Sequence, residues 1–199
     1  MIGVLPYFPK ISVFQRIVQE GRVVIFPELP YDKKWQINRM TVPGSNGLIN
    51  LSIPISGGRN CKLRLDQVEI DNQYHWQRDH FRTLSSVYGR SPFFSFYAAE
   101  LEFLMNQPYS RLLEWNMACF DWVSEKMKFG KKIPVSFVID AILNKNEIKN
   151  TKHDADIHFP VVYNQVFEHS IGFHGDVSIL DLLFNQGANY GKSIIGFSA

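Results

Sequence analysis

The chain has 199 residues, of which 45% are hydrophobic and 20% are charged, and its 21 basic and 19 acidic residues give a net charge of +2. This composition excludes a disordered or fibrous protein, and the length predicts a single domain over residues 1–199. Basic and acidic residues are interspersed, so no basic stripe indicates a nucleic-acid partner.

The sequence also predicts a reduced, cytoplasmic setting. Cys61 and Cys119 are too few for a disulfide framework, and neither has the short-spaced partner of a zinc site, so we expect no metal. Pro6 breaks the N-terminal apolar run too early for a secretory signal. No run of about 18 apolar residues predicts a membrane span. Nothing in the sequence identifies a cofactor.

The opening of the chain reads as strand, turn, helix and strand. Residues 2–5 form a short apolar run that Pro6 stops. Apolar residues then recur every three or four positions from Ile11 to Val18, which predicts a helix ending at Gly21. Residues 23–26 are apolar and β-branched, as in a strand. This order indicates a parallel crossover, although a short helix can also join antiparallel strands.

A hairpin is predicted over residues 37–55, with the tight turn Gly-Ser-Asn-Gly between an apolar arm and an alternating arm. Lys33 precedes it, and Asn38, Arg39 and Asn46 lie within it. Cationic and amide donors held close together suit an anionic or sugar-like ligand, because phosphate, carboxylate and hydroxyl groups offer several acceptors. These four side chains are therefore predicted to bind substrate. The alternative is a solvated hairpin face.

Beyond the hairpin, residues 68–70 read as a short strand, and Asp71 or Asn72 as the N-cap of a helix. Residues 74–127 then have a helical pattern, which predicts three successive helices. The third places Cys119 among apolar residues, so we expect a buried core thiol rather than a nucleophile.

The tail continues the α/β pattern. Residues 135–139 read as a strand, residues 144–158 as a polar mobile loop, and residues 177–184 as a helix that starts near Asp176 or Ser178. The predicted fold is one α/β domain with a strand-rich N-terminal part, a helical middle and a short C-terminal helix packed back on the body. Asp181 and Asn185 lie four residues apart on that last helix, facing either a cleft or each other.

Several of these segments together resemble the WbqC-like protein family, in particular its Bacteroidetes-type members. The similarity extends over nearly the whole chain. Many members carry histidine or glutamine before the first motif, where this chain has Val4 and Leu5. The matching pieces are Tyr7-Phe8-Pro9, Lys33, Asn38-Arg39, Gly44, Asn46-Gly47, residues 51–55, Trp76 with His80-Phe81, Tyr88, residues 91–94, Asn116, Tyr163, residues 165–167, Gly172-Phe173 and residues 178–187.

The resemblance implies a role in bacterial surface-polysaccharide biosynthesis, because members resemble proteins encoded among O-antigen genes. The implied activity is that of a cytoplasmic transferase moving an acyl or aminoacyl group to a nucleotide-linked amino sugar. The alternative is a non-catalytic protein that holds a sugar or a partner enzyme of the pathway. An anionic or nucleotide-linked sugar is the expected partner in either case.

His80 and Tyr7 are the candidate catalytic residues. His80 is the best-placed general acid or base, because imidazole titrates near neutral pH, and its alternative role is that of a histidine at the edge of an aromatic core. Tyr7 follows a predicted strand at the mouth of a turn, where α/β proteins often bind ligands, or else it fixes that turn. No nucleophile motif is present, so a transferase would act by direct transfer.

Overall fold

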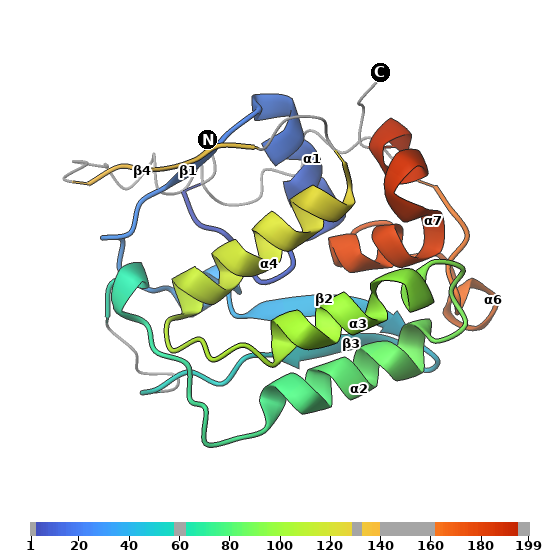
Figure 1. Ribbon diagram of the computed structural model, residues 1–199, viewed down its shortest axis with the longest axis horizontal. Coiled ribbons are helices and arrows are strands. Elements are labelled where there is room, and N and C mark those ends of the chain that lie inside the picture. Colours follow the sequence, from blue (N-terminus) through green and yellow to red (C-terminus); the bar gives the residue numbers. More distant parts are fainter. Residues whose placement is uncertain (1–2, 58–62, 129–132, 140–161, 195–199) are drawn as a thin grey trace.

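The computed structural model of the chain describes residues 3–57, 63–128, 133–139 and 162–194 (Figure 1). Its mixed α/β class is the predicted one, with strands near the N-terminus, helices in the middle and a C-terminal helix. The hairpin runs through the middle of the molecule in Figure 1, with α2 (Trp76–Tyr88) along its lower side. The polar loop predicted over residues 144–158 lies outside the described residues.

The hairpin forms as the sequence predicts. Strand β2 (Arg39–Gly44) pairs antiparallel with β3 (Gly47–Ser52), and Gly44 lies opposite Gly47 across a two-residue turn. Gly47 has φ 125°, a backbone conformation that glycine adopts readily and other residues rarely do. Period-two alternation buries one face of the hairpin and leaves the other partly exposed, which fixes the register.

At the start of the chain, the helix is confirmed and the first strand is wrong. Helix α1 (Ile11–Glu20) ends at Gly21, whose N–H donates to the carbonyls of Ile17 and Val18. Residues 3–5 form no strand, and residue 2 lies outside the described part. Proline has no N–H to donate to a ladder, and the N–H of Tyr7 donates to Ile37 beside the hairpin, so the segment runs toward β2 instead.

Strand β1 (Val23–Ile25) is also confirmed, but its partner is not at the N-terminus. It pairs in parallel with β4 (Val135–Phe137), which confirms the strand predicted near residue 135. The crossover expected between the first two predicted strands is therefore wrong. The parallel connection instead includes the hairpin and the three middle helices, because these elements lie between β1 and β4 in the sequence.

The three middle helices are α2, α3 (Phe94–Met105) and α4 (Leu112–Lys126), as predicted. In the described part of the chain before them, Lys33–Trp35 and Leu65–Gln67 form short 3-10 helices. Residues 68–70 form only isolated bridges and no strand, because they pair with single residues of two different segments.

The N-cap predicted for α2 is wrong. His75 occupies that position, and the carboxylate of Asp71 accepts from the N–H of Gln73, which closes a turn of its own. Asn72 accepts from Nε1 of Trp76 with its side-chain oxygen. Both polar side chains therefore stabilise the turn before the helix.

The C-terminal helix α7 (Ile179–Ile194) follows a short helix α6 (Glu168–Ile171) and packs against α1, α3 and α4. It is interrupted at Gly187, which has φ 69° and lies three residues beyond the end of the predicted helix. Oγ of Ser178 accepts from the N–H of Leu180 at its start. Asp176 caps α1 instead, accepting from the N–H of Ser12 at 3.2 Å.

The core is rich in aromatic residues, and Cys119 is buried within it, as predicted. None of the helices in the described ranges is long and apolar enough to cross a bilayer. The largest fully buried side chains include Tyr7, Phe8, Phe14, Tyr88, Trp115, Phe120 and Phe184.

Candidate functional site

The structure brings together the two side chains predicted to be catalytic. Tyr7 lies just before α1 and His80 lies on α2, yet the Tyr7 hydroxyl is 3.2 Å from Nδ1 of His80 and their rings stack. Trp76 packs edge-on against both rings. Tyr7 is fully buried and His80 is 5% exposed, so this pair is enclosed in the core.

Burial determines the charge state of this pair. Desolvation lowers the pKa of His80 to about 4, although a hydrogen bond to the backbone of Ser52 and the charge of Asp79 act in the opposite direction. His80 is therefore neutral at pH 7. One ring nitrogen donates to Ser52, so Nδ1 accepts from the hydroxyl of Tyr7, whose pKa burial raises well above its usual value. Both ring nitrogens are thus occupied.

Asn38, predicted to orient a ligand, is also part of the fold. Its Nδ2 donates to the carbonyl of Ile53 at 2.8 Å, and its oxygen accepts from the hydroxyl of Tyr31. It is only 9% exposed. Asn116 makes similar bonds nearby, donating to the carbonyls of Leu5 and Ile37. These buried amides hold neighbouring segments together, because each donates to backbone carbonyls that lie outside the paired strands.

The other three predicted ligand residues do not gather in one place. Lys33 is exposed on a short 3-10 helix, and Arg39 is half-buried at the start of β2. Neither side chain has a hydrogen-bond or ion-pair partner among the described residues. Asn46 is exposed at the hairpin tip, and a strand of this length spans about 17 Å, so it lies at the opposite end from Arg39.

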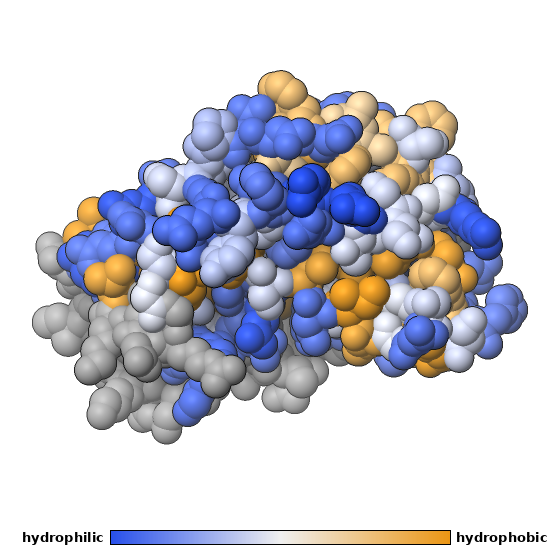
Figure 2. Space-filling view, turned by 90° about the horizontal axis from the view of Figure 1, so that it is seen from below, coloured by the Kyte–Doolittle hydropathy of each residue, from blue (hydrophilic) through white to orange (hydrophobic). Residues whose placement is uncertain are grey.

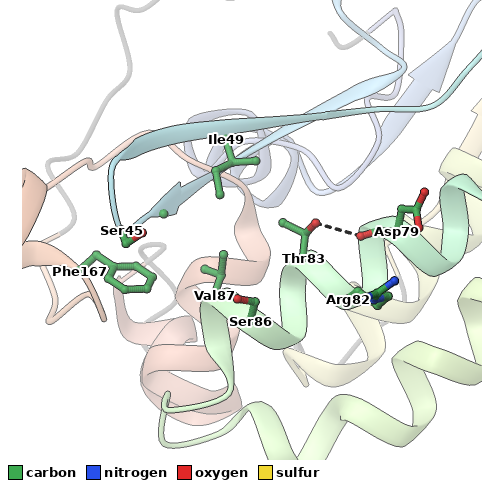
Figure 3. Close-up of a pocket in the computed structure, with 9 residues that line it drawn as sticks. Ser45, Ile49, Asp79, Arg82, Thr83, Ser86, Val87 and Phe167 are labelled. Atoms are coloured by element: carbon green, nitrogen blue, oxygen red, sulfur yellow. Dashed lines mark hydrogen bonds between the residues drawn. The ribbon is translucent and has the colours of Figure 1, made fainter.

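An open groove of about 440 Å³ lies between the hairpin tip and α2 (Figure 3). Such a volume is within the range of small-molecule sites. Close approach at the tip depends on Gly44, because a Cβ there would lie 2.5 Å from Cδ1 of Ile49. The lining residues are Gly44, Ser45 and Ile49 of the hairpin, Asp79, Arg82, Thr83, Ser86 and Val87 of α2, and Phe167.

The groove has a polar end and an apolar end. In Figure 3, Asp79 and Arg82 lie toward one end, and Val87 and Phe167 lie toward the other. The hydroxyl of Thr83 between them donates to the carbonyl of Asp79. The Arg82 side chain has no ion-pair partner among the residues described. This arrangement can hold an amphipathic ligand that carries an anionic group.

A buried polar network positions the segment that carries Phe167. The hydroxyl of Tyr163 and Nε2 of Gln165 both donate to Oδ2 of Asp181, at 2.5 Å and 2.7 Å. Gln165 also accepts from the N–H of His174, which closes the loop around α6. Burial raises the pKa of Asp181, although hydrogen bonds from Tyr163 and Gln165 act in the opposite direction.

Asp181 and Asn185 were expected to face either a cleft or each other, and both expectations are wrong. The Asp181 carboxylate points to Tyr163 and Gln165, and Nδ2 of Asn185 donates to the backbone carbonyl of Asp181. The pair neither lines the groove nor joins side chain to side chain. Satisfying a buried carboxylate requires donors from outside the helix, which spacing along the helix could not reveal.

Sequence reasoning missed the groove. Asp79, Arg82, Thr83 and Ser86 recur at helical spacing, but so do the solvent-facing residues of most surface helices. Phe167 comes from a distant segment and has no local signal. Trp76 and His80, four residues apart, share one face of α2, and that face is the buried one.

The described residues contain no cluster of three or more His, Cys, Asp or Glu side chains that could hold a metal ion. Cys119 is fully buried, and burial raises the pKa of its thiol well above the usual value. A thiol in this state is a poor nucleophile.

The fold and the groove thus define a mixed α/β protein with an open groove, polar at one end and apolar at the other, between a hairpin and a helix. The model of the WbqC-like protein family matches residues 6–151, and the chain belongs to this family. All of the groove except Phe167 falls within that region. No curated protein and no solved structure matches the chain.

Proposed function

We propose that this chain acts as a single cytoplasmic domain that binds an anionic, nucleotide-linked sugar for bacterial surface-polysaccharide biosynthesis of the O-antigen type. Membership of the WbqC-like family fits a polysaccharide-related role. The observation that carries the proposal is the groove, which combines a cation without an ion-pair partner among the described residues, several hydroxyls and an apolar end.

Each part of the groove suits one part of such a ligand. The guanidinium of Arg82 can bind a phosphate or carboxylate through two parallel hydrogen bonds. Sugar hydroxyls can donate to the carboxylate of Asp79 and exchange hydrogen bonds with Ser86. Val87 and Phe167 offer an apolar surface for the less polar face of a sugar ring or for an N-acyl group.

The second candidate function is acyl or aminoacyl transfer to a nucleotide-linked amino sugar. The contact between Tyr7 and His80 favours it, because a hydroxyl and an imidazole in contact can pass a proton. In direct transfer, the sugar amine attacks the acyl carbon of an activated donor and the bond to the leaving group breaks. Nδ1 of His80 can take the proton that the amine loses only once its contact with Tyr7 opens, because this nitrogen accepts from the Tyr7 hydroxyl in the core.

A thermal-shift measurement with UDP-N-acetylglucosamine and UDP tests the binding proposal. A ligand at 100 times its Kd adds about 2.7 kcal/mol to stability, so the melting temperature should rise by about 5 °C or more. We expect Arg82→Ala to lose this rise and Arg39→Ala to keep it. Loss in Arg39→Ala alone would place the ligand on the outer face of the hairpin. No rise in the unmodified protein would contradict binding of this ligand class.

A further inference from the structure

Helix α3 presents a hydrophobic face to solvent. Phe96 and Phe103 are 74% and 70% exposed, whereas Leu101 and Met105 on the opposite side are buried. Figure 2 shows hydrophobic side chains gathered along the upper edge of the molecule, where α3 lies. A helix that is apolar on both sides is normally covered on both sides, and an exposed patch of large apolar residues marks an interaction site.

One end of this face is hollow. A second open groove, of about 410 Å³, lies where the start of α3 meets the end of α4. Its apolar wall consists of Phe93, Phe96 and Tyr97. The charges at its rim are largely paired, because Lys126 forms ion pairs with Glu100 and Glu125. Hydrogen bonds to these carboxylates raise the pKa of Lys126 despite its partial burial.

The other end of the face protrudes. Phe103 follows Phe96 by seven residues, which is about two helical turns and about 10.5 Å along the axis. Ala99 lies between them on the same side, and its small side chain permits another helix to approach closely. The hydrophobic face of α3 therefore has an aromatic hollow before Ala99 and a projecting Phe103 after it. A surface that is complementary to itself is the requirement of a two-fold symmetric contact.

We propose that a second copy of this chain docks on this face. The α3 helices pack antiparallel across a two-fold axis near Ala99, and Phe103 of each copy enters the aromatic hollow of the other. The charges are compatible with this arrangement. Lys128 lies at the hollow end, and it comes opposite the end of the second α3 that carries the acidic residue Glu102.

The size of the contact determines its strength. A phenylalanine buries about 150–250 Å², so the four exposed phenylalanines of two copies would bury about 600–1,000 Å². Stable complexes bury about 1,200 Å² or more, and smaller contacts are transient. We therefore expect a dimer that dissociates in the micromolar range. A membrane is a poorer occupant, because Glu100, Glu102 and Glu125 would be repelled by anionic lipids.

Sedimentation velocity on the full chain tests this proposal. From about 1 μM to about 500 μM, the weight-average mass should rise from 23.0 kDa toward twice that value and no further. Phe103→Ser should remain monomeric over the same range with an unchanged melting temperature. Tyr74→Ser, which removes an aromatic residue that is 64% exposed elsewhere, is the matched control and should associate like the unmodified chain.

A cysteine at the proposed axis adds a direct readout. In a Cys61→Ser background, Ala99→Cys should form a disulfide-linked dimer under mild oxidation, because the Cα atoms of a disulfide lie about 4.4–6.8 Å apart. Tyr74→Cys in the same background should not. A chain that stays monomeric to about 500 μM, equal association of Phe103→Ser, or growth beyond two copies would each overturn the proposal.

Discussion

The two faces of α2 carry polar residues that differ in what they can do. On the inner face, His80 is 5% exposed, neutral at pH 7 and hydrogen-bonded through both ring nitrogens. On the outer face, the neighbouring Asp79 and Arg82 line an open groove. The buried His80 and the exposed Asp79 and Arg82 lie within one turn of the same helix. The comparison shows that burial, rather than residue type, decides which polar group is available to a ligand.

Burying His80 on the inner face costs free energy of hydration, which its hydrogen bonds must offset. Placing an imidazole in the core removes its hydration, and the bonds with Tyr7 and Ser52 restore two hydrogen bonds. The outer face has no such requirement, because water solvates Arg82 and Asp79. We therefore expect substitutions on the inner face to change stability and those on the outer face to change binding.

The largest expected effect is at Leu84, which is fully buried on the inner face. Leu84→Ala should lower the free energy of unfolding by about 2–5 kcal/mol, because it leaves a cavity in the core. Arg82→Ala, two residues away on the outer face, should change it by no more than about 0.5 kcal/mol. Urea denaturation measures both, and a similar loss in the two variants would contradict the assignment of the faces.

The next effect is a pH dependence that His80 confers. Its pKa is about 4 in the folded state and 6.5 normally, so the unfolded chain binds the proton more readily. The stabilisation from keeping His80 neutral is fully present above pH 6.5 and is lost as the pH falls to 4, by about 3 kcal/mol.

Denaturation midpoints measured across this pH range test the prediction. His80→Gln should show a smaller loss of stability between pH 6.5 and 4 than the unmodified chain, because glutamine does not titrate. His75→Gln is the control, since His75 is exposed on the same helix end. Parallel pH profiles for His80→Gln and the unmodified chain would show that His80 titrates as an ordinary exposed histidine.

A smaller effect compares two asparagines of the hairpin region. Asn38→Ala should lower the free energy of unfolding by about 1–3 kcal/mol, because it leaves the buried carbonyl of Ile53 without the donor that Asn38 supplies. Asn46→Ala, at the exposed tip, should cost no more than about 0.5 kcal/mol. Thermal unfolding distinguishes the two. An equal loss of stability in the two variants would mean that the buried amide of Asn38 stabilises the fold no more than an exposed turn residue does.

Local patterns predicted much of this fold. The Gly-Ser-Asn-Gly turn and the alternation after it indicated the hairpin, and apolar spacing indicated α1 and the middle helices. The pairing of β1 with β4 was not predictable in this way, because it joins segments more than 100 residues apart. Val4 and Leu5 are apolar, as in a strand, but their side chains are buried while their backbone has no ladder partner.

The site was less predictable than the fold. Spacing showed that Trp76 and His80 share a helix face, but only the packing of Tyr7 and Trp115 shows that this face is the inner one. The density of donors near Arg39 indicated a site, yet the strand places Asn46 at its far end. Phe167 reaches the groove through the network around Asp181, which depends on tertiary contacts alone.

The most direct test of the account is the affinity of UDP-N-acetylglucosamine for Arg82→Ala and His80→Gln, measured by isothermal titration on folded protein. We predict that Arg82→Ala weakens binding about tenfold or more, since a hydrogen bond to a charged group contributes about 1.5–3 kcal/mol. His80→Gln should bind like the unmodified chain, because His80 faces the core. Full affinity in Arg82→Ala together with lost affinity in folded His80→Gln would contradict the account.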